Sequence, residues 1–447
     1  MGVVGKIPYQ HISRLSERQM DAISIAQTDL EEKARQVLMM SEIFEKSRHL
    51  TIWLGEPNDR KEETMCARIH ERFLAYEFNT GEYFLDEDEL ETLQQILLRR
   101  WFRRRWIIQE ALVSAVSVMP LFRLGTRTWN WEFFSVIVER AKPTDVVEWF
   151  LKLVQPASSD YNLMPYGRPS QPSLLGPTKR ILTQTLFQCL HTFDRAECYD
   201  PRDKIYSLLG ITYGVGHSIQ VDYTSSVEAV YTGLAQDYII ADEAYIEDLL
   251  AMSSCRRAQS PLASWIPDWR IPIHYRSDKH QEALETYMKK WRPSGLVRQG
   301  RTTMDRNSII AQDLSVIKPC FHKDDEEPKA RCSLCGLLKE ADVLPGNLAS
   351  CEHSVRLGED ETCKDCMDDI RLMQDATAEL RALRIEEVLC FSTGWSIAFI
   401  LSETHAGSTE GYRVVSCLTF RRRQTSIFET WRRRLAECAE RKNVRIE

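Results

Sequence analysis

The chain has 447 residues, of which 43% are hydrophobic and 28% are charged, as in an ordinary globular protein of about two or three domains. No apolar run approaches the ~20 residues that a helix needs to cross a bilayer, so we expect no membrane-spanning segment. The formal net charge of −7 excludes a surface that attracts nucleic acid as a whole, and we do not expect the basic clusters Arg99–Arg105 and Arg421–Arg434 to bind it.

The amino-terminal part predicts a helix followed by a strand. Residues 1–20 show little pattern, and we expect them to pack poorly. Thr28 or Asp29 can cap a helix, and apolar residues then recur at three- and four-residue spacings. The side chains expected to be buried along this helix are Val37, Met40, Ile43 and Phe44. The β-like run Leu50–Leu54 follows, and such a step is typical of a parallel sheet flanked by helices.

The segment after this strand is predicted to be mainly helical. Residues 60–76 form a helix, and the acidic stretch Asn79–Glu91 forms a loop. A single long helix is expected over Leu93–Ala111, because large apolar side chains recur along one of its sides. Val113–Phe122 is predicted to be a strand, and Trp129–Ala141 is predicted to be another helix.

The middle of the chain opens with a stretch rich in proline, glycine and serine at 156–177, which we interpret as a linker. Helices are predicted at Ile181–Phe193 and Ser225–Ala241. Between them, Asp200–Gly210 contains a proline that suits a first helical turn and ends in a glycine that suits a helix end. Ser264–Trp269 is an extended aromatic segment interrupted by proline.

The carboxy-terminal part is predicted to mix helices and strands. A helix is expected at Leu372–Ala382, and strands are expected at Val388–Leu401 and Tyr412–Phe420. A basic helix at Phe428–Arg441 is predicted to end the chain.

Two copies of one cysteine and histidine pattern give the most specific chemical signal in the chain. The pattern Cys320-x-His322-x9-Cys332-x2-Cys335 recurs as Cys351-x-His353-x9-Cys363-x2-Cys366. Thiolates and imidazoles are the ligands that tetrahedral zinc prefers. The spacing therefore predicts two zinc sites, with one quartet for each ion. A crossed arrangement, in which the CxxC pair of the first copy joins the Cys-x-His pair of the second, fits the spacing equally well.

Buried cysteines and disulfides are the competing interpretations of these residues. The chain has 13 cysteines, and Met1–Gln10 lacks the basic start and apolar core of a secretory signal. We therefore expect a cytoplasmic, reducing location, in which thiols bind metal or stay reduced. Four protein ligands leave no position for a substrate water, so both zinc ions are expected to be structural.

Other polar residues have interpretations that require no catalysis. The chain contains no nucleophile elbow, zinc-protease helix or phosphate-binding loop motif. Trp101 and Trp106 are expected to anchor a core, and Glu110 to pair with a nearby arginine. Asp203 is interpreted as a helix-start carboxylate, and Arg202 as one half of a structural ion pair.

Several separated segments together resemble the fungal heterokaryon incompatibility (HET) domain. They are Asp21–Asp29, Glu32-Lys33, Gln36-Val37, Ile52–Gly55, Trp101–Glu110, Gly125, Trp131, Pro201–Gly210, Val221–Tyr223 and Ser264–Trp269. Their order and spacing across residues 21–270 make the resemblance specific. Ser24 and Ala26 replace the cysteine and asparagine that the family usually has. The family's opening motif, Y-x-x-L-S-Y-x-W-G, is absent, so the chain resembles a HET domain without its first strand and helix.

The resemblance and the residue patterns together predict an α/β fold with a partly parallel sheet flanked by helices, then a small zinc-bound segment and an α+β part. The expected divisions are a poorly patterned start at 1–20, a truncated HET domain at 21–155, a linker at 156–177, a HET-associated helical region at 178–300, a zinc-binding module at 318–368 and the α+β region at 369–447.

The function that the resemblance implies is intracellular non-self recognition or signalling, which triggers growth arrest or cell death through protein–protein contacts, including self-association. Toll/interleukin-receptor-type domains, to which the HET domain has been likened, include NAD-cleaving enzymes, and such an enzyme is the first alternative. The absence of the opening strand weighs against it, because a doubly wound sheet binds ligands at its strand ends. A zinc-dependent interaction module or nucleic-acid-binding module is the second alternative. No catalytic or cofactor-binding residue is assigned.

Overall fold

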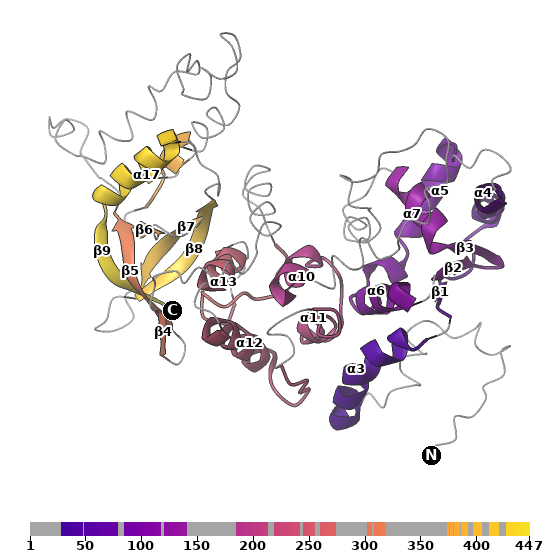
Figure 1. Ribbon diagram of the computed structural model, residues 1–447, viewed down its shortest axis with the longest axis horizontal. Coiled ribbons are helices and arrows are strands. Elements are labelled where there is room, and N and C mark those ends of the chain that lie inside the picture. The colour runs from indigo at the N-terminus through magenta and orange to yellow at the C-terminus, as the bar shows by residue number, and fades with distance from the viewer. Residues whose placement is uncertain are drawn as a thin grey trace, which may run out of the picture. The chain divides into compact units, whose positions relative to one another are not determined.

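The protein is a mixed α/β protein that divides into two compact units, Met1–Val230 and Tyr231–Glu447 (Figure 1). The computed structural model describes residues 28–47, 49–78, 85–117, 120–140, 185–212, 219–241, 245–254, 260–273, 302–305, 308–318, 373–374, 376–378, 380–384, 386–391, 397–404, 411–419 and 426–447.

The first unit contains a small, partly parallel sheet, as the sequence predicts. Its first strand, β1 (Thr51–Trp53), pairs in parallel with β2 (Leu121–Leu124), which pairs antiparallel with β3 (Arg127–Asn130). The expected helix precedes β1 as α3 (Leu30–Glu45), and Asp29 caps it by accepting a hydrogen bond of 2.9 Å from the backbone of Glu32. The predicted helix–strand step is therefore confirmed.

Four further helices and one 3-10 turn pack around this sheet. They are α4 (Arg60–Phe78), α5 (Glu87–Leu97), η1 (Arg100–Arg103), α6 (Ile107–Ser117) and α7 (Trp131–Arg140). Aromatic rings fill the space between them and β2. The ring of Phe122 lies 4.1 Å from that of Phe134 and 5.7 Å from that of Trp101, and Phe122 is fully buried. Burial of one such side chain contributes about 1.5–3 kcal/mol.

The predicted long helix Leu93–Ala111 is wrong, because the chain turns twice between α5 and α6. Arg99 and Arg104 adopt extended backbone conformations on either side of η1. The Arg99 side chain donates hydrogen bonds to the carbonyl oxygens of Leu54 (2.6 Å) and Glu56 (2.9 Å). Arg105 donates to the carbonyls of distant residues in the same unit. These tertiary hydrogen bonds outweigh the helical preference of the local sequence.

The helix boundaries around this break also differ from expectation. Within the acidic stretch predicted as a loop, residues 87–91 instead start α5, because Asp86 and Glu89 form a capping box in which each side chain accepts from the other's backbone at 2.9 Å. The strand predicted over Val113–Phe122 is largely wrong, since α6 continues to Ser117. On α3, only Val37 of the predicted buried stripe is buried, and Ile43 is 51% exposed.

The rest of the first unit is a compact helical segment. It contains α10 (Leu186–Thr192) and α11 (Asp203–Tyr206), and α12 (Val227–Ala241) begins there and continues into the second unit. Thr185 and Gln188 form a capping box that starts α10, within the helix predicted at Ile181–Phe193. The helical turn expected in Asp200–Gly210 is present, although α11 is short.

A ring of strands forms the second unit, together with α13 (Tyr245–Ser254) and α17 (Ser426–Glu437). The strands are β4 (Thr302–Asp305), β5 (Ser308–Ile317), β6 (Glu387–Phe391), β7 (Ile397–Thr404), β8 (Gly411–Thr419) and β9 (Glu440–Ile446). Each strand from β4 to β9 pairs with the next, and β9 also pairs with β5, which closes the ring from β5 to β9. Trp431 and Leu435 of α17 pack on β5, β6 and β7.

The carboxy-terminal predictions are partly confirmed. The strand expected at Tyr412–Phe420 is β8, but the strand expected over Val388–Leu401 is two antiparallel strands, β6 and β7. The predicted final helix is α17, and it does not end the chain. It is followed by β9, in which only alternate residues such as Val444 and Ile446 are buried. Because polar residues lie between the buried ones, the hydrophobic pattern of the sequence did not predict this strand.

Several expectations concern residues outside the described ranges. The poorly patterned start at 1–20, the linker at 156–177 and all eight predicted zinc ligands belong to this group. Within the described ranges, no group of three or more His, Cys, Asp or Glu side chains is arranged to hold a metal ion. No helix in the described part of the chain combines the length and apolar character needed to cross a bilayer.

Candidate functional site

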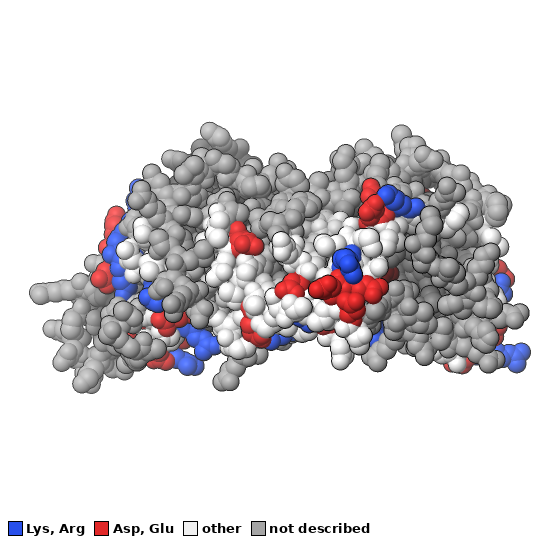
Figure 2. Space-filling view, turned by 90° about the horizontal axis from the view of Figure 1, so that it is seen from below, with Lys and Arg blue, Asp and Glu red and all other residues white. Residues whose placement is uncertain are grey.

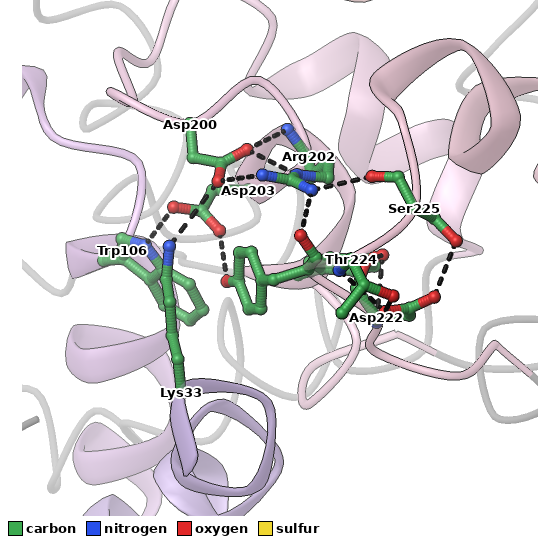
Figure 3. Close-up of polar contacts among 10 residues, drawn as sticks. Lys33, Trp106, Asp200, Arg202, Asp203, Asp222, Thr224 and Ser225 are labelled. Carbon is green, nitrogen blue, oxygen red and sulfur yellow. Dashed lines mark hydrogen bonds and ion pairs between the residues drawn. The ribbon is translucent and has the colours of Figure 1, made fainter. Parts of the chain in front are cut away.

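A cluster of polar side chains joins three separate segments of the first unit (Figure 3). Its members are Lys33 of α3, Trp106 just before α6, Asp200, Arg202 and Asp203 at the start of α11, and Tyr223 from the segment before α12. We call these six residues the Asp203 cluster. Figure 3 shows Lys33 and Trp106 approaching the carboxylates of Asp200 and Asp203 from the side of α3 and α6.

The carboxylate of Asp203 is at the centre of the cluster. One of its oxygens accepts a hydrogen bond of 2.5 Å from the Tyr223 phenol, and the other accepts one of 3.1 Å from the Trp106 indole. Asp203 is only 6% exposed. Burial raises the pKa of its carboxyl, and the two hydrogen bonds and the charge of Lys33 offset this only in part. Burial, followed by the charge of Asp203, likewise raises the pKa of Tyr223.

Arg202 and Asp200 form a bidentate ion pair beside Asp203. The Arg202 Nε and Nη2 atoms each lie 2.9 Å from a different carboxylate oxygen of Asp200. Burial alone would raise the pKa of Asp200, but hydrogen bonds from the side chain and backbone of Arg202 outweigh it, so this pKa lies below its usual range. Arg202 also donates to the carbonyl oxygens of Tyr223 (2.5 Å) and Ser225 (2.7 Å). The ion pair expected of Arg202 is thus present, and it holds the segment before α12 in place.

Lys33 connects α3 to the cluster. Its Nζ lies 3.5 Å from an Asp200 carboxylate oxygen and 3.8 Å from the centroid of the Tyr223 ring. The Arg202 guanidinium carbon lies 5.2 Å from the same centroid. Both cations are therefore within range of a favourable interaction with the Tyr223 ring. Since the Lys33 side chain is only 17% exposed, water screens these interactions incompletely.

Main-chain hydrogen bonds make the surroundings of the cluster rigid. Arg105 is fully buried and donates to the carbonyl oxygens of Phe193 and Lys204, the latter at 2.6 Å. The ammonium of Lys204 donates to the carbonyl oxygens of Asp194 (2.7 Å) and Ala196 (2.8 Å). Cationic side chains that bond carbonyl oxygens of several loops hold those loops together.

The segment beyond Tyr223 is ordered by a second carboxylate. Asp222 accepts hydrogen bonds from the hydroxyl of Ser225 (2.6 Å) and from the backbone of Thr224 (2.7 Å). These bonds, led by that from Ser225, lower the pKa of Asp222 to about 2. The Tyr206 phenol donates to the backbone oxygen of Asp222 at 3.0 Å. The turn is therefore built from its own side chains and fastened to α11.

The residues singled out in the sequence have different places in this structure. Trp101 is a core residue, as expected. Trp106 is half-buried, and its indole N–H bonds Asp203. Glu110 lies half-buried in the first turn of α6. Asp203 does start a helix, but its carboxylate faces side chains from two other segments. Sequence reasoning missed the roles of Lys33, Asp200 and Tyr223, although Lys33 and Tyr223 lie within the segments that resemble the HET domain.

The arrangement brings four of the HET-like segments into contact. Residues 32–33, 101–110, 201–210 and 221–223 are far apart in sequence, and each contributes a side chain or a main-chain contact to the cluster or its surroundings. Chemically, the cluster is a network of two carboxylates, two cations, a phenol and an indole, in which Asp203 and Tyr223 are buried and the other four residues are half-buried.

Two of these four segments, 32–33 and 101–110, lie within a match to a known family. A family model described as heterokaryon incompatibility protein (HET) matches residues 10–110. The chain carries a HET domain. Lys33 and Trp106 lie inside the matched range, whereas Asp200, Arg202, Asp203 and Tyr223 lie beyond it.

One curated relative extends the HET similarity. Heterokaryon incompatibility protein 6, OR allele, of Neurospora crassa is 24% identical over 314 residues, which cover 58% of this chain and 46% of the relative. The match thus spans less than half of the relative's length. No solved structure matches the chain. The HET domain of this chain is therefore identified by its sequence, and its geometry is that described above.

Proposed function

We propose that this HET-domain chain acts in the cytoplasm as a non-self recognition or signalling protein of the heterokaryon incompatibility type. In this proposal it triggers growth arrest or cell death through protein–protein contacts. The HET match and the similarity to the Neurospora crassa protein support the class of function. The contacts of the Asp203 cluster join the HET-matched segment to later residues of the first unit, which supports the view that this unit acts as one folded body.

The observation that carries this proposal is the contact between Trp106 and Asp203. The indole nitrogen lies inside the HET match, and the carboxylate that accepts its hydrogen bond at 3.1 Å lies well beyond it. A buried carboxylate that lost this donor would be left partly unsatisfied. The folded part of the chain that signals is therefore expected to include at least residues 28–225, since the HET-matched segment alone would lack the partners of Lys33 and Trp106.

Inducible expression in a filamentous fungus tests the proposal. Expression of the full chain should arrest growth or kill the cells, and Asp203→Asn together with Tyr223→Phe should weaken this effect at equal protein levels. The matched control is Asp237→Asn, because Asp237 is an exposed carboxylate on α12 outside the cluster. Normal growth at high levels of the folded wild-type protein would refute a role as a death trigger.

An NAD-cleaving enzyme is the second candidate, because one feature of the cluster favours it. Ionisable groups with shifted pKa values, such as Asp203, Asp200 and Tyr223, are more frequent at catalytic sites than elsewhere. Purified protein should be incubated with NAD and assayed for nicotinamide release. If the wild type releases nicotinamide and Asp203→Asn does not, the protein acts through an enzymatic mechanism and not through contacts alone.

We also propose that the two Cys and His quartets hold about two structural zinc ions, one per quartet. The donor set of three thiolates and one imidazole suits tetrahedral zinc. The quartets lie in the chain between β5 and β6, where Ile317 of β5 is paired with Leu389 of β6. A zinc-dependent module could therefore depart from the strand ring and return to it at neighbouring strands, and it would provide a further surface for protein contacts.

A further inference from the structure

The outward face of α3 combines exposed apolar side chains with charges of both signs. Leu38 is 57% exposed, Met39 is 42% exposed and Ile43 is 51% exposed, which is unusual for three large apolar residues so close together on one helix. Arg35 and Glu42 are exposed on the same side, since residues three and four apart on a helix are neighbours. We call these five residues the outer face of α3.

The opposite side of α3 contacts the rest of the first unit. It packs against α6, and Val37 on this side is buried (Figure 1). Lys33 points from this side into the Asp203 cluster. Because the inner side makes these contacts, another molecule could meet the outer face without disturbing the unit's core. Within α3 itself, Glu42 of this face forms an exposed ion pair with Lys46.

The charges on the outer face are arranged with a symmetry that points to a particular partner. Arg35 lies three residues before Leu38, and Glu42 lies three residues after Met39. Glu31 and Lys46, both exposed, lie seven residues before Leu38 and seven residues after Met39. A second α3 running antiparallel, with a two-fold axis at the midpoint of Leu38 and Met39, would place a positive charge opposite a negative charge at all of these positions.

From this pattern we infer that α3 pairs antiparallel with α3 of a second copy of this chain. Arg35 would face Glu42 of the partner subunit, and Glu31 would face Lys46 of the partner subunit. Each contact occurs twice, as a two-fold interface requires. Leu38 and Met39 would pack at the centre, flanked by Ile43. The inference deepens the proposed function, on which it rests for its biological meaning, by naming the surface and the partner of one protein contact.

The size and chemistry of the face predict a weak and reversible dimer. One helix pair buries less surface than the ~1,200–2,000 Å² that is typical of stable complexes. Figure 2 shows acidic and basic side chains close together on the side of the molecule that it presents, with other residues between them. Contacts between such exposed charges weaken as salt is added, because ions screen them.

Sedimentation velocity of the full-length protein over a range of concentrations tests the inference. The wild type should show a reversible monomer–dimer equilibrium that weakens at high salt. Arg35→Glu and Glu42→Arg should each raise the dissociation constant about tenfold, because each places like charges opposite one another. The double variant R35E/E42R should return to within about threefold of the wild type, because its charges are complementary again. Leu38→Ser should weaken the dimer without any charge change.

Ile240→Ser is the matched control, since Ile240 is 71% exposed on α12 and lies outside the outer face of α3. It should leave the equilibrium unchanged, and circular dichroism should confirm that all variants fold. A wild type that stays monomeric at its highest soluble concentration would overturn the inference. A dimer unaffected by the single swaps, or not restored by the double swap, would overturn it as well. Growth arrest measured with a folded but monomeric variant separates this failure from failure of the proposed function.

Discussion

The phenol of Tyr223 donates a hydrogen bond of 2.5 Å to the carboxylate of Asp203, and both side chains are buried. Asp203 is the first residue of α11, and Tyr223 lies in the segment before α12. Their contact links the start of α11 to the approach of α12, and it leaves the other oxygen of Asp203 for Trp106. The stability of the first unit should therefore depend on a hydroxyl that the sequence alone does not identify.

Tyr223→Phe is expected to lower the free energy of unfolding by about 1–3 kcal/mol, because the substitution removes the only donor to one buried oxygen of Asp203 among the described contacts and changes little else. Urea denaturation followed by tryptophan fluorescence measures this. Tyr199→Phe is the control, since Tyr199 is fully exposed and its hydroxyl should matter little. Equal stability of the two variants would contradict the role of the Tyr223 phenol.

The two cluster carboxylates should respond to pH in opposite directions. The folded protein holds a proton on Asp203 more readily than the unfolded chain does, so the contribution of this group falls as pH rises from its ordinary pKa of 3.8 through the raised value. Asp200 has a lowered pKa, so its contribution is present above 3.8 and is lost as pH falls toward the folded value.

The test is to measure the free energy of unfolding of the wild type and of each asparagine variant from about pH 3 to pH 7, and to take the difference, wild type minus variant. This range spans the ordinary carboxyl pKa values. For Asp203→Asn this difference should shift in favour of the wild type as the solution becomes more acidic. For Asp200→Asn it should shift against the wild type. Parallel pH profiles for the two variants would show that the environments of the carboxyls are not those described.

Gly55, two residues beyond the end of β1, has a backbone φ of +100°, a conformation that residues with a side chain rarely adopt. A Cβ atom at this position would also lie 2.9 Å from Nη1 of Arg99, which holds the carbonyl of Leu54. Gly55→Ala should therefore lower the free energy of unfolding by about 1–3 kcal/mol. Gly233→Ala is the opposite control. Gly233 lies within α12, and an added Cβ there has no neighbour within 4 Å, so alanine should stabilise the helix by up to about 1 kcal/mol.

Elemental analysis of protein purified without added metal should give about two zinc ions per chain, as two four-ligand sites require. A strong chelator should then make the 318–368 segment sensitive to protease, because thiolate and imidazole ligands cannot hold the segment once the metal is removed. Cys332→Ser should lower the zinc content, and Cys438→Ser should not, because Cys438 lies outside both quartets. A metal-free protein with a protease-resistant segment would contradict the zinc proposal.

Local signals in the sequence predicted those elements whose boundaries are fixed locally. Asp29 caps α3 through its own side chain, and Gly55, with its positive φ, lies two residues beyond the end of β1, so both ends could be read from neighbouring residues. The break between α5 and α6 could not be predicted in this way. It depends on Arg99 and Arg105, whose side chains bond carbonyl oxygens of residues far away in sequence, and nothing in the local pattern marks them as different from solvent-exposed arginines.

The candidate site was predictable in its parts and not as a whole. Trp106, Arg202 and Asp203 stood out because of the segments in which they lie, and the ion pair expected of Arg202 is present. The convergence of Lys33 and Tyr223 on Asp203 depends on the packing of α3 against α6 and on the turn around Asp222. Such contacts follow from tertiary structure, which a spacing pattern within one segment does not encode.

The ring of strands in the second unit has a consequence for how the protein is made. Strand β5 lies between β6 and β9 in the ring, and β9 is the last of these strands to leave the ribosome. During translation β5 can pair with β6 while its other edge stays without β9, and the ring cannot close before β9 has been synthesised. If translation stops within α17, the ring of strands therefore stays open, and the edge of β5 that pairs with β9 stays unpaired. An unpaired strand edge can bind chaperones or other nascent chains.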